Sequence, residues 1–433
     1  MKTQRLLRAG IGIAAVTSLT LLAGCSGGDD SATGSNSGVA PEGETTTIQF
    51  WHSMSGTNGE SIDAVVESFN ASQDEVEVVA TFQGSYPETL TKLQQSIPAG
   101  TGPDISMVER AFVPLLAEAK VLADLNPFLE SSDMSEETFV EGLMGNITFD
   151  GELNAIPFNR SSPMLHVNQT ALDELGLEVP TTWEETEAVA NALVVKNGSE
   201  TSRYGITMNY ESWWPISLIV QQGGSFFNED GTAIGFDEEG VEAFEFIKRM
   251  QDSGALYYPP TTDSGNVVGQ MFLGGQVGMV VNSSGSIGGY LQNATFDYQT
   301  AFLPEGDRAA APTGGANLVM LADSDKQDPA WTFLEWLIND AEGGQRFIKD
   351  TGYVPFTPAI AESDEFVELF EAEPQRKVAY DQLANSIDTN NSPHFAEIDQ
   401  EFLKTIQAIM YDDADIETSL DAFIERANAI LAD

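Results

Sequence analysis

The chain is long and strongly acidic. It has 433 residues, of which 67 are Asp or Glu and 19 are Lys or Arg, so its formal net charge is −48 at pH 7. This charge disfavours binding to nucleic acids or to anionic lipid head groups. Disorder is excluded because 42% of the residues are hydrophobic. A chain of this length is expected to form two lobes, and its single Cys excludes an internal disulfide or a multi-cysteine metal site.

The N-terminus has the pattern of an export signal. Basic residues occur among residues 2–8, an uncharged run extends from Ala9 to Leu22, and Leu22-Ala-Gly precedes Cys25. The run is shorter than the about 20 residues that span a bilayer, so residues 1–24 are predicted to be a signal peptide. The last residues resemble the lipobox of bacterial lipoproteins. This resemblance implies lipidation of Cys25, followed by a flexible linker to residue 45, and an exported protein anchored on the outer face of the cell membrane.

From residue 46 onwards, strand and helix patterns alternate. Strands are predicted at 46–51, 76–82 and 104–108, and helices at 62–69, 90–97, 111–121, 240–250 and 330–338. Another helix is predicted to begin at Thr181 or Thr182, with Glu184 and Glu185 in its first turn. Strands separated by helices of this length indicate an α/β protein with a mainly parallel sheet.

Motifs for catalysis, nucleotide binding and metal binding are absent from the sequence. His52, His166 and His394 lie far apart, without the spacing of metal ligands. We therefore predict no catalytic residues, no cofactor and no metal. A surface glycoside hydrolase with paired carboxylates is an alternative from another class, but no acid pair stands out from the abundant carboxylates. A structural or adhesive lipoprotein is a third hypothesis.

Small polar and aromatic residues cluster after predicted strands and in loops. In open α/β sheets ligands bind at the carboxyl ends of strands, and polyols need short polar groups and an aromatic face. The clusters are Gly84-Ser-Tyr86, Glu109, Asn159–Pro163, Tyr210 with Trp213-Trp214, Ser283–Ser286, Gly314-Gly315 and Thr351-Gly-Tyr353.

Several of these segments, together with Ile48–Met54, resemble the family 1 extracellular solute-binding proteins of carbohydrate ABC importers. The resemblance runs from about Thr46 to the C-terminus, and FWHSM, GSY, SSGS and TGYVP favour the glycerol-phosphate branch. It implies a type II-like periplasmic-binding-protein fold, with two α/β lobes joined by hinge segments and a ligand cleft between them. The implied N-terminal lobe comprises 46–160 and 284–325, and the C-terminal lobe comprises 161–283 and 326–433.

The same resemblance implies the ligand-binding residues. They are Tyr86, Glu109, Ser161, Trp213, Ser283, Gly315 and Tyr353, with Tyr210 as a possible second aromatic. The family's phosphate-binding Arg is replaced by Asn391, and Arg160 is a possible substitute cation.

The resemblance also implies the function. A monomeric receptor would capture glycerol-3-phosphate or a glycerophosphodiester and deliver it to ABC permease subunits served by a cytoplasmic ATPase. Because the expected Arg is missing, a neutral sugar or oligosaccharide remains the alternative ligand.

Overall fold

The computed structural model describes residues 45–387 and 392–432. The described residues do not include the predicted signal peptide, Cys25, the linker up to residue 44, or Asn391. The predictions for these residues stay predictions. In the part that is described, no helix is long and apolar enough to cross a membrane.

The first sheet has the strand order β2-β1-β3-β16-β6. Its strands are β1 (Thr46–His52), β2 (Val76–Phe82), β3 (Ile105–Glu109), β16 (Gly314–Met320) and β6 (Ile156–Ser161). The first three are parallel, whereas β16 runs antiparallel to both β3 and β6. Because β16 joins the sheet late in the chain and in the opposite direction, the sheet is mixed rather than mainly parallel.

The second sheet has the order β12-β9-β13-β7-β14, and β8 pairs with β9 at the side. Its strands are β7 (Pro163–Asn168), β8 (Val195–Asn197), β9 (Glu200–Met208), β12 (Leu256–Tyr257), β13 (Val277–Ser283) and β14 (Tyr298–Phe302). Short two-stranded pairs are formed by β4 (Thr148–Phe149) with β5 (Glu152–Leu153), β10 (Ser225–Phe227) with β11 (Ile234–Gly235), and β15 (Ala311–Pro312) with β17 (Ser386–Ile387).

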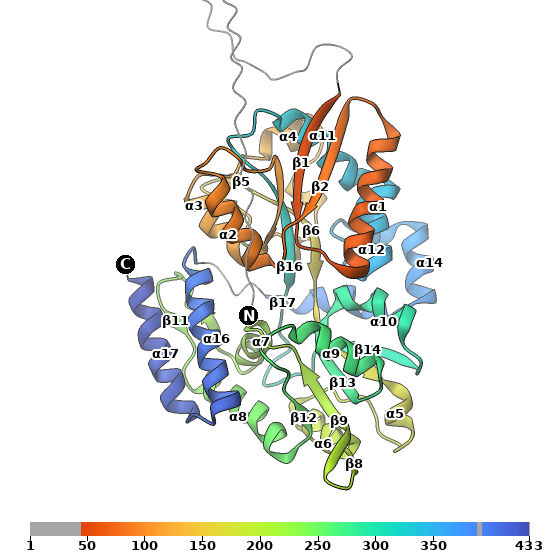
Figure 1. Ribbon diagram of the computed structural model, residues 1–433, viewed down its shortest axis with the longest axis vertical. Helices are drawn as coiled ribbons and strands as arrows, with labels where there is room; N and C mark the ends of the chain where they lie inside the picture. The colour runs from red at the N-terminus through yellow and green to blue at the C-terminus, as the bar shows by residue number, and fades with distance from the viewer. Residues whose placement is uncertain (1–44, 388–391, 433) are drawn as a thin grey trace, which may run out of the picture. The chain divides into compact units, whose positions relative to one another are not determined.

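Helices pack on both sheets (Figure 1). Those associated with the first sheet include α1 (Gly56–Ser72), α2 (Tyr86–Ser96), α11 (Gln327–Asn339) and α12 (Arg346–Thr351). Those associated with the second sheet include α5 (Gln169–Asp173), α6 (Trp183–Leu193), α7 (Trp213–Gln221), α8 (Glu238–Ser253), α9 (Ser264–Leu273) and α15 (Pro374–Asp381). The remaining α-helices are α3 (Val113–Glu118), α4 (Asn126–Ser131), α10 (Ile287–Asn293), α13 (Pro358–Glu362), α14 (Asp364–Ala372), α16 (Phe395–Asp412) and α17 (Ile416–Leu431).

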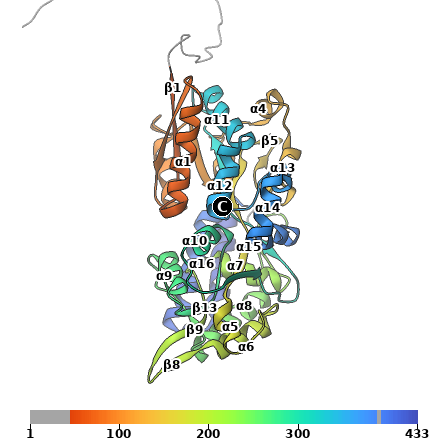
Figure 2. The same ribbon diagram turned by 90° about the vertical axis from the view of Figure 1, so that its right-hand side faces the viewer.

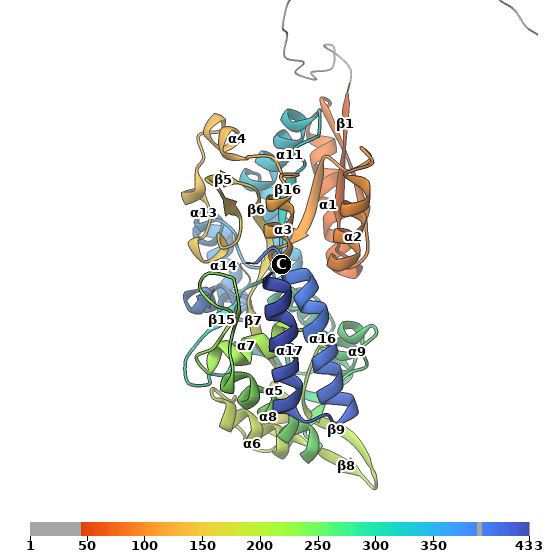
Figure 3. The same cartoon turned by 90° about the vertical axis from the view of Figure 1, so that its left-hand side faces the viewer.

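Two helix groups late in the chain matter for the site. Figure 2 shows α13, α14 and α15 following one another, and Figure 3 shows α16 and α17 as a neighbouring pair. The pair is held to the second sheet's helices by an aromatic cluster, in which the rings of Phe402 and Phe423 lie 4.8 Å apart and both pack near Phe236. Burying such large rings supplies much of the local stabilisation.

Most predicted elements are present with small boundary shifts. The helix start near residue 182 is confirmed, because the Thr182 hydroxyl caps α6 by accepting from the Glu185 amide at 3.2 Å. The helix predicted for 111–121 is shorter: a 3₁₀ turn at Arg110–Phe112 precedes α3.

The strand pairing differs from the predicted lobe boundaries in two places. Strand β14 lies within the segment 284–325 assigned to the N-terminal lobe, yet it pairs with β7 in the second sheet. Helices α11 and α12 lie within the segment 326–433 assigned to the C-terminal lobe, yet they pack on β1 and α1. The chain therefore crosses between the sheets later than predicted, and the other boundaries stay a prediction.

Candidate functional site

A buried amide forms the centre of the first group of predicted site residues. Asn159, on β6, is 0% exposed and donates from Nδ2 to the Tyr86 hydroxyl at 2.8 Å. The Tyr353 hydroxyl interacts with Asn159, Tyr86 and Asn58. Asn159 Oδ1 has no hydrogen-bond partner among the described residues. We call these four residues, Asn58, Tyr86, Asn159 and Tyr353, the Asn159 corner.

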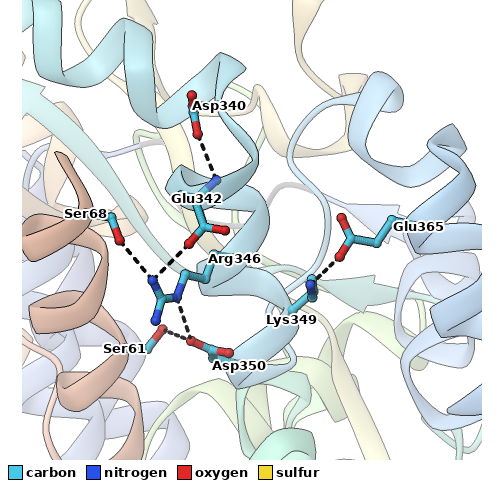
Figure 4. A network of polar contacts seen from close by, with 8 residues as sticks. All are labelled: Ser61, Ser68, Asp340, Glu342, Arg346, Lys349, Asp350 and Glu365. Atoms are coloured by element: carbon cyan, nitrogen blue, oxygen red, sulfur yellow. Dashed lines mark hydrogen bonds and ion pairs between the residues drawn. The ribbon is translucent and has the colours of Figure 1, made fainter. Parts of the chain in front are cut away.

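Local chain geometry fixes both tyrosines of the corner. Tyr86 is the first residue of α2, and the Ser85–Glu88 capping box holds the start of that helix. Tyr353 follows α12, which Arg346 ties to α1 by donating to Ser68 Oγ at 2.9 Å (Figure 4). Ser61 of α1 donates to Asp350 at 3.1 Å and completes this link. The corner is therefore held by contacts that lie outside it.

The β6–β16 pairing positions Ser161, Gly315 and Trp213. Ser161 pairs with Gly314 and Arg160 pairs with Gly315 in this ladder. Gly315 has φ +83°, and a Cβ atom there would lie 2.0 Å from the Asn159 carbonyl oxygen, so only glycine fits. The Trp213 ring packs against Gly314, and its indole donates to the Pro312 carbonyl at 2.8 Å.

Ser283 lies at the end of β13, where the second sheet approaches the Asn159 corner. Its hydroxyl accepts from the Gly285 amide at 3.1 Å, and Gly285 contacts the Tyr353 ring. A second contact between these two segments lies at Gly288, three residues further along the chain. A Cβ atom at Gly288 would lie 2.3 Å from the Thr351 carbonyl oxygen and 2.4 Å from that of Asp350. The start of α10 and the end of α12 can therefore touch only because residue 288 has no side chain.

Three carboxyl groups from different elements form a second group. Burial raises the pKa of Glu109 to about 8; the negative charge of Asp399 adds to this, and that of Glu211 also raises it. Burial, with Asp399 nearby, raises the pKa of Glu211 to about 7, and burial raises the pKa of Asp399 to about 6. Burial is the first cause for all three, so each carboxyl group resists ionisation. We call Glu109, Glu211 and Asp399 the carboxylate row.

The row adjoins the corner. Burial raises the pKa of the Tyr86 hydroxyl well above its ordinary value, and the neighbouring Tyr353 and Glu109 raise it further. Glu109 thus belongs to both groups. The candidate site consists of a neutral hydrogen-bonding corner followed by a row of carboxyl groups.

The two arginines of the region are bound to the protein itself. Arg160 is 1% exposed, and its guanidinium donates to the Gly314 carbonyl at 3.0 Å, the Leu143 carbonyl at 2.6 Å and Thr313 Oγ1 at 2.6 Å. Arg110 Nε donates to the Thr313 carbonyl at 2.5 Å. Both positive charges lower the pKa of Glu109. These contacts favour a structural role for Arg160, and its predicted role as a ligand cation stays a prediction.

The two aromatic residues predicted near the site, Tyr210 and Trp213, are part of the described structure, but Trp213 does not lie in a loop. Trp213 is the first residue of α7 rather than part of a loop, and its ring stacks on that of Trp214 with centroids 4.4 Å apart. Tyr210 donates from its hydroxyl to the Leu403 carbonyl at 2.8 Å, on α16. Tyr210 directly precedes Glu211 in the chain, and Trp213 follows it by two positions.

Asn58, Glu211 and Asp399 were not predicted from the sequence, and Asn159 was predicted only as part of a motif. Glu211 stands between two predicted aromatic residues, and this position was the available signal. Asp399 lies in a long amphipathic helix and has no local signal. No group of side chains able to hold a metal ion occurs among the residues that the structure describes.

Residues 64–377 match the bacterial extracellular solute-binding proteins. The chain belongs to this family.

Similar proteins agree with the family assignment. The sn-glycerol-3-phosphate-binding periplasmic protein UgpB of Escherichia coli O1:K1 / APEC is 26% identical over 414 residues, which cover 89% of this chain and 92% of that protein. Among solved structures, UgpB from Mycobacterium tuberculosis in complex with glycerophosphocholine has a TM-score of 0.79 at 21% identity, covering 90% of this chain and 99% of that one. The cyclic alpha-maltosyl-1,6-maltose binding protein from Arthrobacter globiformis has a TM-score of 0.72 at 26% identity, covering 90% and 99%.

The solute-binding proteins matched here are substrate-binding transport proteins, not enzymes, and their fold is the two-lobed α/β fold that was predicted. The family and its periplasmic relatives indicate an exported protein that binds a small molecule for an ABC importer.

Proposed function

We propose that this solute-binding protein is a lipid-anchored receptor that captures glycerol-3-phosphate or a glycerophosphodiester and delivers it to an ABC permease. The relatives named for glycerol-3-phosphate span nearly the whole chain, which supports this ligand class. Cys25 would carry the lipid, and a cytoplasmic ATPase would drive transport. The receptor would act as a monomer and release its ligand chemically unchanged.

The observation that carries the proposal is the arrangement of the Asn159 corner beside Glu109. Two tyrosine hydroxyls and a carboxamide with an unpartnered oxygen offer both donors and acceptors at one place. A glycerol group has hydroxyls that donate and accept at this spacing. Hydrogen bonds that involve a charged group contribute about 1.5–3 kcal/mol each, so a few give micromolar affinity.

Isothermal titration of the exported protein tests the ligand class. We expect heat of binding and thermal stabilisation with glycerol-3-phosphate or with at least one glycerophosphodiester, and mass spectrometry should recover the ligand unchanged. Glucose and maltose serve as comparison ligands. If no glycerol phosphate compound binds, the proposed ligand class is wrong.

A neutral oligosaccharide is the second candidate. The ring of Trp213, which is partly exposed and backed by the buried ring of Trp214, provides a flat apolar surface on which a sugar ring could pack, and this observation favours it. The same titration separates the candidates, because maltose-type sugars would then bind and the phosphodiesters would not.

The lipid anchor needs its own test. Partition of the exported protein into a detergent phase should be lost in Cys25→Ser, which cannot form the thioether. A protein that stays in the aqueous phase before and after the change would contradict the anchor. The same preparations give the oligomeric state by light scattering.

A further inference from the structure

One edge of the first sheet is only half covered. Strand β2 stands at the end of the strand order and lies beside α1 (Figure 1). An edge strand presents backbone N–H and C=O groups that no neighbouring strand pairs, and proteins usually cover such groups because another chain can bind to them. The pairing of β2 with β1 decides which of its groups point to this edge.

The register with β1 assigns the direction of every backbone group in β2. The Thr46 amide donates to the Glu75 carbonyl at 2.8 Å, and the Gln83 amide donates to the His52 carbonyl at 2.8 Å, at the two ends of one parallel ladder. In such a ladder each residue directs both of its backbone groups to one side of the strand, and the side alternates along the chain. Odd-numbered residues of β2 therefore bond to β1, and even-numbered residues point outward. The outward residues are Val76, Val78, Ala80 and Phe82.

Amide side chains cover the first half of this edge. Asn70, on α1, donates to the Val78 carbonyl at 2.9 Å and accepts from the Val78 amide at 2.8 Å. Gln73 donates to the Val76 carbonyl at 2.7 Å and accepts from the Val76 amide at 2.8 Å. Both outward residues of this half thus have side-chain partners in place of a strand.

The second half of the edge lacks such partners. Among the described residues, no hydrogen bond is found for the outward backbone groups of Ala80 and Phe82. We call these groups the open edge. At the end of the second sheet, by contrast, Gln375 of α15 donates to the Tyr298 carbonyl of β14 at 2.7 Å. The open edge is therefore an exception to the way in which this chain covers β14 and the first half of β2.

Apolar and acidic side chains surround the open edge. Phe82 is 51% exposed and Val79 is 37% exposed. A groove of about 530 Å³ runs between Ala80 and α1, and the exposed carboxylates of Asp63 and Glu67 line it. An added strand finds backbone partners here, with apolar side chains beside them and negative charge along one flank.

Charge decides which kind of strand fits. A second copy of this chain would bring its own Asp63 and Glu67 to the same edge, together with a net charge of −48, so pairing between two copies is opposed by repulsion. A segment that carries Lys or Arg is instead attracted to both carboxylates. Charge complementarity thus favours a basic partner over a second copy.

We propose that the open edge binds an extended, basic segment of a partner protein, which adds a strand to the first sheet next to β2. The loop that follows β2 leads to Tyr86 of the Asn159 corner, so the partner docks beside the candidate site. This interaction is independent of which small molecule the protein binds.

A synthetic peptide of about six residues, the usual length of a strand, is the probe. Lysine alternates with valine in it, and a second peptide with glutamate in place of lysine is the comparison. We expect saturating lysine peptide to slow hydrogen exchange at the amides of Ala80 and Phe82 about tenfold or more, measured by NMR, because both amides become hydrogen-bonded. The glutamate peptide should have no effect. Unchanged exchange with the lysine peptide would overturn the proposal.

A proline at the open edge removes pairing without changing charge. Ala80→Pro replaces one outward N–H by a ring, while the bonds to β1 remain because the odd-numbered residues make them. Affinity for the lysine peptide should fall at least about tenfold, and small-molecule binding should stay the same. Ala80→Ser, which keeps the N–H, is the matched control. Equal peptide affinities in the two variants would show that only unspecific charge attraction holds the peptide, and the proposal would be wrong.

The two carboxylates of the groove test the choice of a basic partner. Asp63→Asn combined with Glu67→Gln should weaken the lysine peptide about 3- to 10-fold, the size of one or two exposed ion pairs. Glu368→Gln combined with Glu371→Gln, at exposed positions of α14, removes the same charge elsewhere and should leave the affinity unchanged. Equal losses in the two double variants would contradict a basic segment bound in this groove.

Light scattering tests the other occupant, a second copy. We expect the unchanged protein and Ala80→Pro to have the same mass at all concentrations. A dimer that Ala80→Pro dissociates would show that the open edge pairs with itself, and the proposed partner would be wrong.

Discussion

The Asn159 corner and the carboxylate row lie side by side and are built on opposite principles. In the corner, neutral groups donate to and accept from one another, and the nearby Arg110 and Arg160 are bound to backbone carbonyls. In the row, burial raises the pKa of all three carboxyl groups, and the charge of Asp399 raises the pKa of Glu109 and Glu211 further. The difference teaches that one half of the site is suited to recognise shape and hydroxyls, and the other half to recognise charge.

Breaking the contact between α10 and α12 should cause the largest loss of ligand affinity. Gly288→Ala places a methyl group against the Thr351 and Asp350 carbonyls, so α10 can no longer contact α12. If the arrangement in which α10 contacts α12 is the one that binds ligand, lowering its population to about 1% reduces ligand affinity about 100-fold with every ligand contact unchanged. Titration calorimetry measures the loss.

The adjacent residue provides the control for that change. Gly289 is also on α10, and a Cβ atom there would meet nothing within 4 Å. Gly289→Ala should therefore keep the affinity of the unchanged protein. Equal affinities in both variants would show that the contact at residue 288 does not contribute to binding.

Glu109 belongs to both halves, so its removal should affect all ligands alike. Glu109→Ala removes a carboxyl group that we propose accepts from ligand hydroxyls, and we expect affinity to fall about 10- to 100-fold for every glycerol-containing ligand. If only ligands with one kind of head group lose affinity, Glu109 acts with the carboxylate row and not with the Asn159 corner.

Changing Arg160 should lower the stability of the fold without changing which ligand is preferred. Arg160→Met removes donors to Gly314, Leu143 and Thr313 that hold β6 and β16 together. Leaving these buried acceptors unpaired costs about 1–3 kcal/mol each, so the melting temperature should fall by several degrees. We expect the ratio of glycerophosphocholine to glycerol-3-phosphate affinities to stay the same. A specific loss of the phosphate ligands would instead make Arg160 a ligand cation.

The carboxylate row should also make stability depend on pH, with the smallest effect of the series. The folded-state pKa of Glu109 is raised from 4.5 to about 8 and that of Glu211 from 4.5 to about 7. Their protonated forms favour the folded state, so this stability is fully present below about pH 4.5 and is lost as the pH rises towards 8. The melting temperature of the ligand-free protein should fall between pH 5 and pH 8, less so in Glu109→Gln. An identical profile in that variant would contradict the assignment.

The sequence predicted the elements whose signals are local. Strand β2 spans the predicted residues 76–82, a run rich in valine, and α6 begins directly after its capping threonine. Gly315 was named as a ligand-binding residue only through resemblance, and its tight contact was not predicted, because the cause is a neighbouring strand whose paired residue, Arg160, lies 155 positions earlier in the chain. Asp399 could not be predicted at all, since it joins Glu109 only when α16 packs beside the Arg110–Phe112 turn. Parallel pairing was overestimated because β16 and β14 return from distant parts of the chain.

The stacked indoles of Trp213 and Trp214 have an optical consequence. Their centroids lie 4.4 Å apart with an interplanar angle of 30°, next to Glu211 and against Gly314. Two chromophores this close share their electronic excitation, so a small rotation of either ring changes the circular dichroism and fluorescence of the pair. The protein thus carries its own spectroscopic reporter at the point where the neutral and the charged halves meet, and ligand capture can be followed without a label.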